Sequence, residues 1–154
     1  MATTLVNATL KVTVKEEITL NGSRQDSENV VNISDINEIY KRIVTCTANQ
    51  STAIATFAND VYETVGAIDI EDSKYIRVTN LDGDNSVELA VVTVGTTYQV
   101  KLDAGHSHIL GSADDAMLAE ADTTPSFGTM ADIKSLQINP GSNAVDVEVF
   151  VAST

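Results

Sequence analysis

Short segments in which apolar and polar residues alternate run along the whole chain and limit what it can fold into. Residues 10–20 carry charged or hydroxyl side chains on one parity, and the other parity holds Leu10, Val12, Val14, Ile18 and Leu20. The last segment repeats the pattern with Val145, Val147, Val149 and Val151. Because successive side chains of a strand point to opposite faces, each segment predicts a strand with one buried face and one solvated face.

Turn-forming Asn, Asp and Gly residues separate these segments at intervals of about 8 to 15 residues, a spacing typical of sandwiches, jelly rolls and barrels. The sequence therefore predicts an all-β chain: an antiparallel β-sandwich or jelly roll with one or two short helices. At 154 residues the chain is long enough for one core. We interpret residues 1–154 as a single β-sandwich domain, with residues 1–7 as a flexible N-terminal arm.

The N-terminal half of the chain gives several local expectations. A first strand over residues 8–20 needs a bulge near Glu16-Glu17, because Glu16 falls on the apolar parity. The turn residues Asn21-Gly22-Ser23 follow, and then a polar loop over residues 24–29 and a short strand over residues 30–33. Asp35 and Glu38 have the spacing of a capping box, which predicts one helical turn before the next strand.

The C-terminal half predicts two hairpins and a longer helix. The first hairpin pairs residues 75–80 with residues 87–94 across a loop rich in Asp, Gly and Asn. The second pairs residues 133–138 with the closing strand. Residues 112–120 predict a helix, since Ser112 can cap it and acidic residues occupy its first turn.

Composition sets the character of the core and of the surface. Aromatic residues make up only 5% and there is no Trp, so Val, Ile, Leu and Ala must fill the core, together with Phe57, Phe127 and Phe150. The single cysteine, Cys46, ends an apolar run and predicts a buried, unreactive thiol. Nine basic and 22 acidic residues give a net charge of −13, which argues against nucleic-acid binding.

No apolar stretch reaches 18 residues, so no membrane span is expected. The first residues lack the charged and apolar regions of a signal peptide, which predicts a chain made in a cytoplasm and kept or assembled there.

Motifs for catalysis and cofactor binding are missing from the sequence. There is no nucleophile elbow and no phosphate-binding loop, so we predict no enzyme activity, no catalytic residue and no cofactor. The only two histidines, His106 and His108, form a His-x-His pair that a strand would present on one side, as a metal pair requires. This pair is similar to the metal motif of cupins, but the neighbouring glycine and acid are misplaced and a third histidine is missing.

Two other interpretations remain open. The segment Asp82-Gly83-Asp84-Asn85 is similar to a calcium loop, but Thr93 occupies the position where an EF-hand needs its bidentate acid. A hairpin tip is the favoured interpretation, and a weak calcium site is the alternative. A sugar-binding module would need aromatic platforms, of which the chain has few.

Three stretches in the last 80 residues resemble small virion proteins of tailed bacteriophages: residues 75–89, residues 100–110 and residues 133–149. The resemblance implies a non-enzymatic virion structural protein, most simply a capsid decoration or cement protein on the outer capsid surface. It also implies the major capsid protein or other virion proteins as partners, synthesis in the host cytoplasm, and a homo-oligomer such as a trimer. A tail adaptor, fibre or receptor-binding component is the alternative within the virion class. A cupin-like metal-dependent enzyme centred on His106 and His108 is the alternative from another class.

Overall fold

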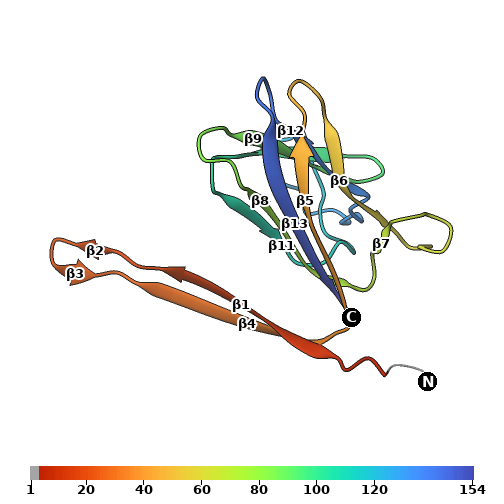
Figure 1. Ribbon diagram of the computed structural model, residues 1–154, viewed down its shortest axis with the longest axis horizontal. Coiled ribbons are helices and arrows are strands. Elements are labelled where there is room, and N and C mark those ends of the chain that lie inside the picture. The colour runs from red at the N-terminus through yellow and green to blue at the C-terminus, as the bar shows by residue number, and fades with distance from the viewer. Residues whose placement is uncertain (1–3) are drawn as a thin grey trace.

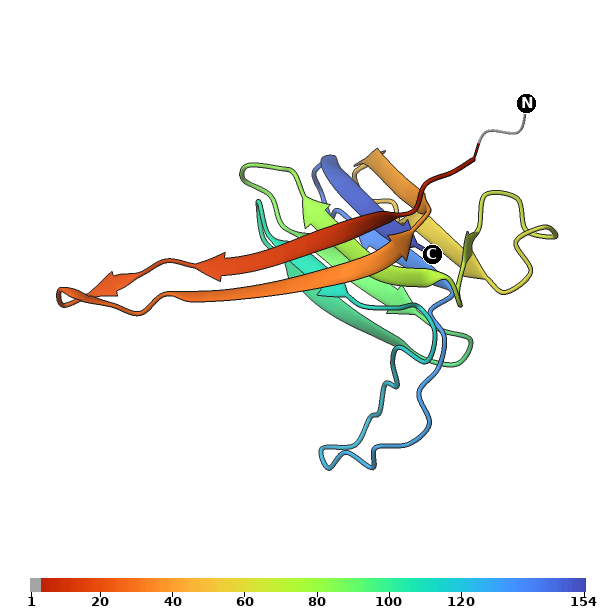
Figure 2. The same cartoon turned by 90° about the horizontal axis from the view of Figure 1, so that it is seen from below.

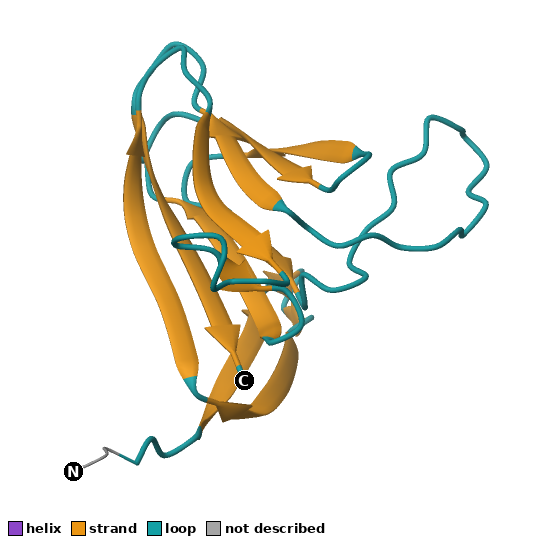
Figure 3. Ribbon diagram, turned by 90° about the vertical axis from the view of Figure 1, so that its right-hand side faces the viewer, coloured by secondary structure: helices purple, strands orange, loops and turns teal. Residues whose placement is uncertain are grey.

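The computed structural model describes residues 4–154, and every regular element in that range is a strand (Figure 3). Two sheets pack face to face, and a long hairpin projects from them (Figure 1). The four-stranded sheet has the order β11-β8-β13-β5 and consists of β5 Glu38–Cys46, β8 Ser73–Asn80, β11 Ser107–Leu110 and β13 Val145–Ser153. The five-stranded sheet has the order β10-β9-β12-β6-β7 and consists of β6 Thr52–Ala58, β7 Ile68–Asp69, β9 Val87–Val92, β10 Thr97–Leu102 and β12 Ser135–Asn139. The prediction of an all-β sandwich is confirmed.

The chain crosses from one sheet to the other at almost every connection. It passes from β5 to β6, from β8 to β9, from β10 to β11, and from β12 to β13, so that sequence neighbours lie in opposite sheets. Only β9 and β10 form a hairpin within the sandwich, and the pairing of β6 with the short β7 is parallel. This alternation of strands between two sheets is the topology of a jelly roll.

Aliphatic side chains fill the space between the two sheets. The inward parity of β13 is fully buried through Val145, Val147, Val149 and Val151. Leu136 and Ile138 of β12 belong to the same core from the facing sheet. Phe57 also lies in this core, as predicted. The prediction for Phe127 is wrong: its side chain is 89% exposed on the loop between β11 and β12, while Phe150 lies half-buried on the outer face of the four-stranded sheet.

Both predicted C-terminal hairpins are wrong in their pairing, although their strands exist. β8 pairs with β13 and β11, whereas β9 pairs with β10 and β12. The loop between β8 and β9 is therefore an arch that joins the two sheets. The connection between β12 and β13 is a second arch of the same kind.

Both predicted helices are also wrong, since no helix occurs in residues 4–154. Within this described range, then, no helix could cross a membrane. In the region 112–120, the N–H groups of Ala116 and Met117 donate to the carbonyl of Ala131, at 3.1 and 3.2 Å, and not to the preceding turn. The side chains of Ala113 and Met117 are buried and hold this long loop, which extends away from the sandwich (Figure 2).

The N-terminal strands form the projecting hairpin, which we define as residues 8–36. Its long strands are β1 Ala8–Glu16 and β4 Ser27–Ile36, and its tip contains β2 Thr19–Leu20 and β3 Ser23–Arg24. The loop predicted for residues 24–29 is therefore largely strand. At the tip, Asn21 and Gly22 both have positive φ angles, of 50° and 78°, as a tight two-residue hairpin turn requires. The predicted N-terminal arm, residues 1–7, precedes β1, and its residues 1–3 lie outside the described part of the chain.

A bulge lies at the base of the projecting hairpin and not near Glu16-Glu17, where we predicted one. Ala8 pairs with Ile36 and Leu10 pairs with Ile33, so Ser34 and Asp35 together oppose Thr9. Asp35 has a φ angle of 63°, and this left-handed residue replaces the helix cap predicted there. Bulges bend a strand and increase its twist. The chain leaves the hairpin at this point and enters β5 directly.

Candidate functional site

The structure places the two histidines in different environments. His106 is exposed in the turn before β11, where its backbone N–H donates to the backbone carbonyl of Asp103 at 3.0 Å. His108 lies in β11 with its ring half-buried, and its Nε2 atom shares a hydrogen bond of 2.9 Å with the Tyr98 hydroxyl. Burial lowers the pKa of His108 and raises the pKa of Tyr98. The Nε2 atom of His108 is thus engaged by a residue of the facing sheet.

One group of three potential metal ligands occurs among residues 4–154, and neither histidine belongs to it. It consists of Asp114, Asp115 and Asp132 on the long loop between β11 and β12. An oxygen of Asp132 already accepts the N–H of Asp115 at 3.1 Å. The Asp132 carboxylate therefore has a structural role in fixing the loop.

The segment that is similar to a calcium loop uses its first acid to build the arch between β8 and β9. One oxygen of Asp82 accepts the N–H groups of Asp84 and Asn85, at 2.8 and 2.6 Å. These backbone hydrogen bonds lower the pKa of Asp82. Below them, the buried Asn80 amide donates to the carbonyls of Asn85 and Leu102. The segment forms an Asx turn, where we predicted a hairpin tip.

Cys46 is fully buried at the end of β5, as predicted. Burial raises the pKa of its thiol, so the reactive thiolate is disfavoured.

The most unusual surface belongs to the projecting hairpin. At its base, four aliphatic side chains pack against two aromatic residues on the outer face of the four-stranded sheet. The aliphatic residues are Leu10, Val12, Ile33 and Ile36, and the aromatic residues are Tyr75 and Phe150. The rings of Tyr75 and Phe150 meet edge to face, with centroids 6.0 Å apart. The N–H of Asn37, just beyond the hairpin, donates to the carbonyl of Ser153 at 3.0 Å. The base of the hairpin is thus fixed to the sandwich.

Away from the base, the same apolar parity continues without cover. Its exposed fraction is 42% at Val14 and 46% at Val31, and it rises to 54% at Ile18 and 60% at Leu20 near the tip. This is the parity that the sequence predicted to be buried throughout, and the prediction is wrong for its distal half. The hairpin diverges from the sandwich, so no other strand lies over these residues (Figures 1 and 2). Glu16 lies on the same parity between Val14 and Ile18, so the exposed apolar side chains form two groups, one near Val14 and Val31 and one at the tip. Exposed apolar groups gathered in this way are typical of interaction sites.

A cleft separates the diverging hairpin from the sandwich. Its volume is about 320 Å³. The hairpin lines it with Val12, Val14 and Val31, and the sandwich lines it with Tyr75 of β8 and Ile109 of β11. An adjoining hollow of about 360 Å³ shares four of these residues and extends to Arg77 and Phe150. The two hollows form one mainly apolar surface.

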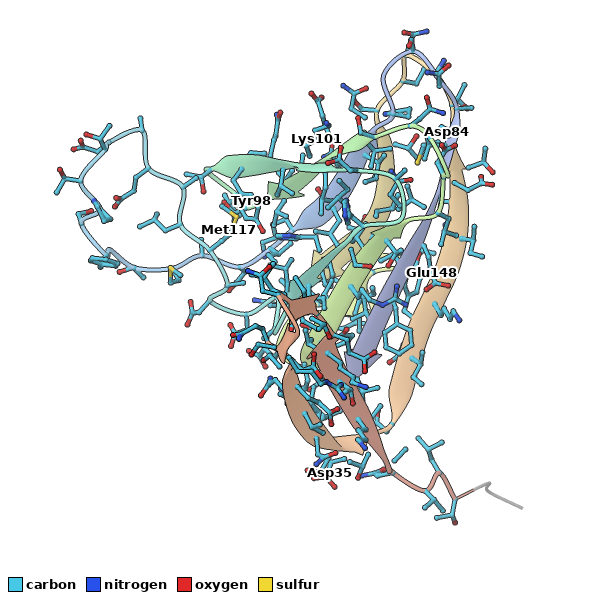
Figure 4. All side chains as sticks on the ribbon, turned by 90° about the vertical axis from the view of Figure 1, so that its left-hand side faces the viewer. Asp35, Asp84, Tyr98, Lys101, Met117 and Glu148 are labelled. Atoms are coloured by element: carbon cyan, nitrogen blue, oxygen red, sulfur yellow. The ribbon has the colours of Figure 1, made fainter. Side chains whose placement is uncertain are left out.

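Charged groups flank this surface on the outer face of the four-stranded sheet. Glu148 of β13, which is labelled in Figure 4, lies among them. It pairs with Arg77 of β8 at 2.5 Å and with Lys41 of β5 at 3.5 Å. The hydrogen bond from Arg77 is the main cause that lowers the pKa of Glu148. The guanidinium of Arg77 also lies 5.9 Å from the centroid of the Phe150 ring. The side chains that border the hairpin are therefore held in place by one another.

The strands of this surface were predictable from the sequence, but their role was not. Apolar and polar side chains alternate in β1 as they do in β13. This alternation alone does not say whether another element covers the apolar face. The sequence carries no local signal that distinguishes the two cases, because burial of a face depends on what packs against it.

Comparison with known proteins adds little to this picture. No protein-family model and no curated protein sequence matches the chain. A solved structure described as "Bacillus endospore appendages form a novel family of disulfide-linked pili" is similar to it, with a TM-score of 0.42 and 11% sequence identity. The match covers 94% of this chain and 90% of that one. At this TM-score the likeness assigns neither a family nor a function.

Proposed function

We propose that this chain is a non-enzymatic structural protein that acts as an assembly subunit and contacts other proteins through its projecting hairpin. The uncovered apolar side chains on either side of Glu16, at Val14 and at Ile18 and Leu20, carry this proposal, because a monomer gains nothing from keeping them in water. The edges of the hairpin add to it: β1 and β4 pair only with each other, which leaves one backbone edge of each strand free for pairing.

Within this class, we propose a capsid decoration or cement protein on the outer surface of a tailed-phage head, with the major capsid protein as partner. The resemblance of residues 75–89, 100–110 and 133–149 to small virion proteins supports this assignment. The net charge of −13 suits an outer position better than one beside packaged DNA. Binding to the assembled lattice alone would stabilise the lattice by mass action.

Purified particles of the phage that encodes the chain provide the first test. Quantitative mass spectrometry should find this chain at a copy number comparable to that of the major capsid protein. A few copies per particle would indicate a tail adaptor, fibre or receptor-binding component, and complete absence would reject a virion role.

The role of the hairpin is tested with the variant Ile18→Asp/Leu20→Asp, which places charge on the uncovered apolar face. We expect this variant to be lost from the particles, whereas Val94→Asp, at an exposed position of the β9–β10 turn, should be incorporated like the wild type. Normal incorporation of the double variant would show that the hairpin does not make the contact.

A further inference from the structure

The cleft beneath the projecting hairpin and the tip of the hairpin are two uncovered apolar surfaces on one chain. The cleft exposes Val14, Val31 and Ile109, and the tip exposes Ile18 and Leu20. Both surfaces are apolar and they differ in shape: the cleft is concave, and the tip carries two large aliphatic side chains on a narrow ribbon. They therefore match in polarity and are complementary in shape.

The tip cannot fill the cleft of its own chain. A strand rises about 3.3 Å per residue, so the six residues from Val14 to Leu20 extend over about 20 Å. The antiparallel pairing of the hairpin keeps both strands extended, and its tip points away from the sandwich (Figure 1). The tip can reach such a cleft only on another molecule.

The distribution of charge on the chain also favours another molecule of the same chain as the partner. The charged residues that line the two hollows are Lys11, Lys74 and Arg77, all of them basic, in a chain where 22 acidic residues outnumber nine basic ones. The distal hairpin, residues 15–28, carries four acidic and two basic residues. Lys15 pairs with Glu17 and Arg24 pairs with Asp26, which leaves Glu16 and Glu28 as the acids without an ion pair among the described residues. Arg77 is already paired with Glu148, so Lys11 and Lys74 provide the attraction for these acids.

We propose that the cleft of one molecule is the binding site for the distal hairpin of a second copy of this chain. Ile18 and Leu20 of the second copy enter the cleft between the hairpin and the four-stranded sheet, and its acidic side chains lie near Lys11 and Lys74. This inference rests on the proposed function, because it assumes that the hairpin makes the assembly contacts. It adds the identity of the partner and the surface that receives it.

Disulfide trapping with the full-length chain tests the contact directly. Two single variants, Leu20→Cys at the tip and Ile109→Cys in the cleft, are purified separately, mixed and oxidised. The native Cys46 is fully buried and does not compete. The matched control mixes Leu20→Cys with Val94→Cys, which is highly exposed but lies in the five-stranded sheet's β9–β10 turn.

We expect the tip–cleft mixture to give at least about ten times more cross-linked dimer than the control mixture, because a specific contact raises the local concentration of the two thiols. Equal yields from the two mixtures would overturn the proposal. Sedimentation of the unmodified chain provides the second measurement: self-association should weaken at least about tenfold in Leu20→Asp and also weaken in Lys11→Glu. The control Lys101→Glu, on β10, should leave it unchanged.

The two proposals can fail separately. If the wild-type chain sediments as a monomer at every concentration but Ile18→Asp/Leu20→Asp is lost from particles, the second-copy proposal is wrong and the hairpin binds a different virion protein. If the tip–cleft dimer forms but the double variant enters particles normally, the contact between copies is real and the proposed function of the hairpin is wrong.

Discussion

At the scale of single residues, the pair Tyr98 and His108 shows how the sandwich is closed along one side. The two residues lie on β10 and β11, which are edge strands of opposite sheets, and their side chains share a hydrogen bond of 2.9 Å. Along the other side, the Tyr40 hydroxyl of β5 donates to the carbonyl of Ile54 in β6 at 3.3 Å. Polar bridges thus join the sheets on both sides of the aliphatic core.

The buried state of His108 predicts a pH dependence of stability. Burial lowers the pKa of the folded imidazole below its ordinary value of 6.5, so the unfolded chain binds the proton more readily. As pH falls below that value, this residue therefore destabilises the fold. The free energy of unfolding, measured in urea at about pH 7.5 and about pH 5.5, should fall less in His108→Gln than in the wild type. A pH dependence of His108→Gln identical to that of the wild type would contradict the assignment.

The sequence singled out His108 but not its partner. Tyr98 is only ten positions away, yet the chain changes sheets between the two residues, and a prediction from strand period treats each strand alone. The same limit applies to Asp82, whose turn was predicted from its residues while the arch it forms was not. Local chemistry was predictable at these positions, and the contact across the sheets was not.

At the scale of elements, the projecting hairpin depends on a small anchor. Ile36 is 3% exposed and packs with Tyr75 and Ala152 where the hairpin passes into β5. The left-handed Asp35 next to it lies in the bulge that bends the strand away from the sandwich. The anchor and the bulge together set where the hairpin leaves the body.

Removing the anchor should loosen the hairpin without unfolding the sandwich. Ile36→Ala leaves a cavity at the base, a change that costs about 2–4 kcal/mol for a buried isoleucine. Hydrogen exchange should accelerate at the amides of β1 and β4, while the amides of β8 and β13 keep their protection. In the control Val94→Ala, at an exposed position outside the hairpin, exchange should stay as in the wild type. Unchanged protection of β1 and β4 in Ile36→Ala would show that the base is held by other contacts.

At the scale of the whole molecule, β13 is the structural centre. It pairs with β5 on one side and β8 on the other, and its inward valines are fully buried in the core. Strands of the sandwich that are far apart in the sequence therefore depend on β13, which makes the sandwich one cooperative unit.

A matched pair of valines tests this central role of β13. Val149→Ala in β13 should reduce the free energy of unfolding by about 2 kcal/mol, because two buried methyl groups are lost. The same substitution at Val94, which is 85% exposed, should change it by less than about 0.5 kcal/mol. Urea unfolding measures both values. A similar effect at the two positions would mean that the core is not centred on β13.

The sequence by itself determined that this protein is made of strands, where most of them lie, and where the tight turn at Asn21-Gly22 falls, because side-chain period and turn conformation are local properties. The tertiary structure alone decided which sheet each strand joins. It also decided that the helix predicted at Ser112 is a loop and that the first apolar face extends uncovered beyond the sandwich. Strand pairing and burial depend on what lies opposite a face, and in a jelly roll that neighbour is usually distant along the chain.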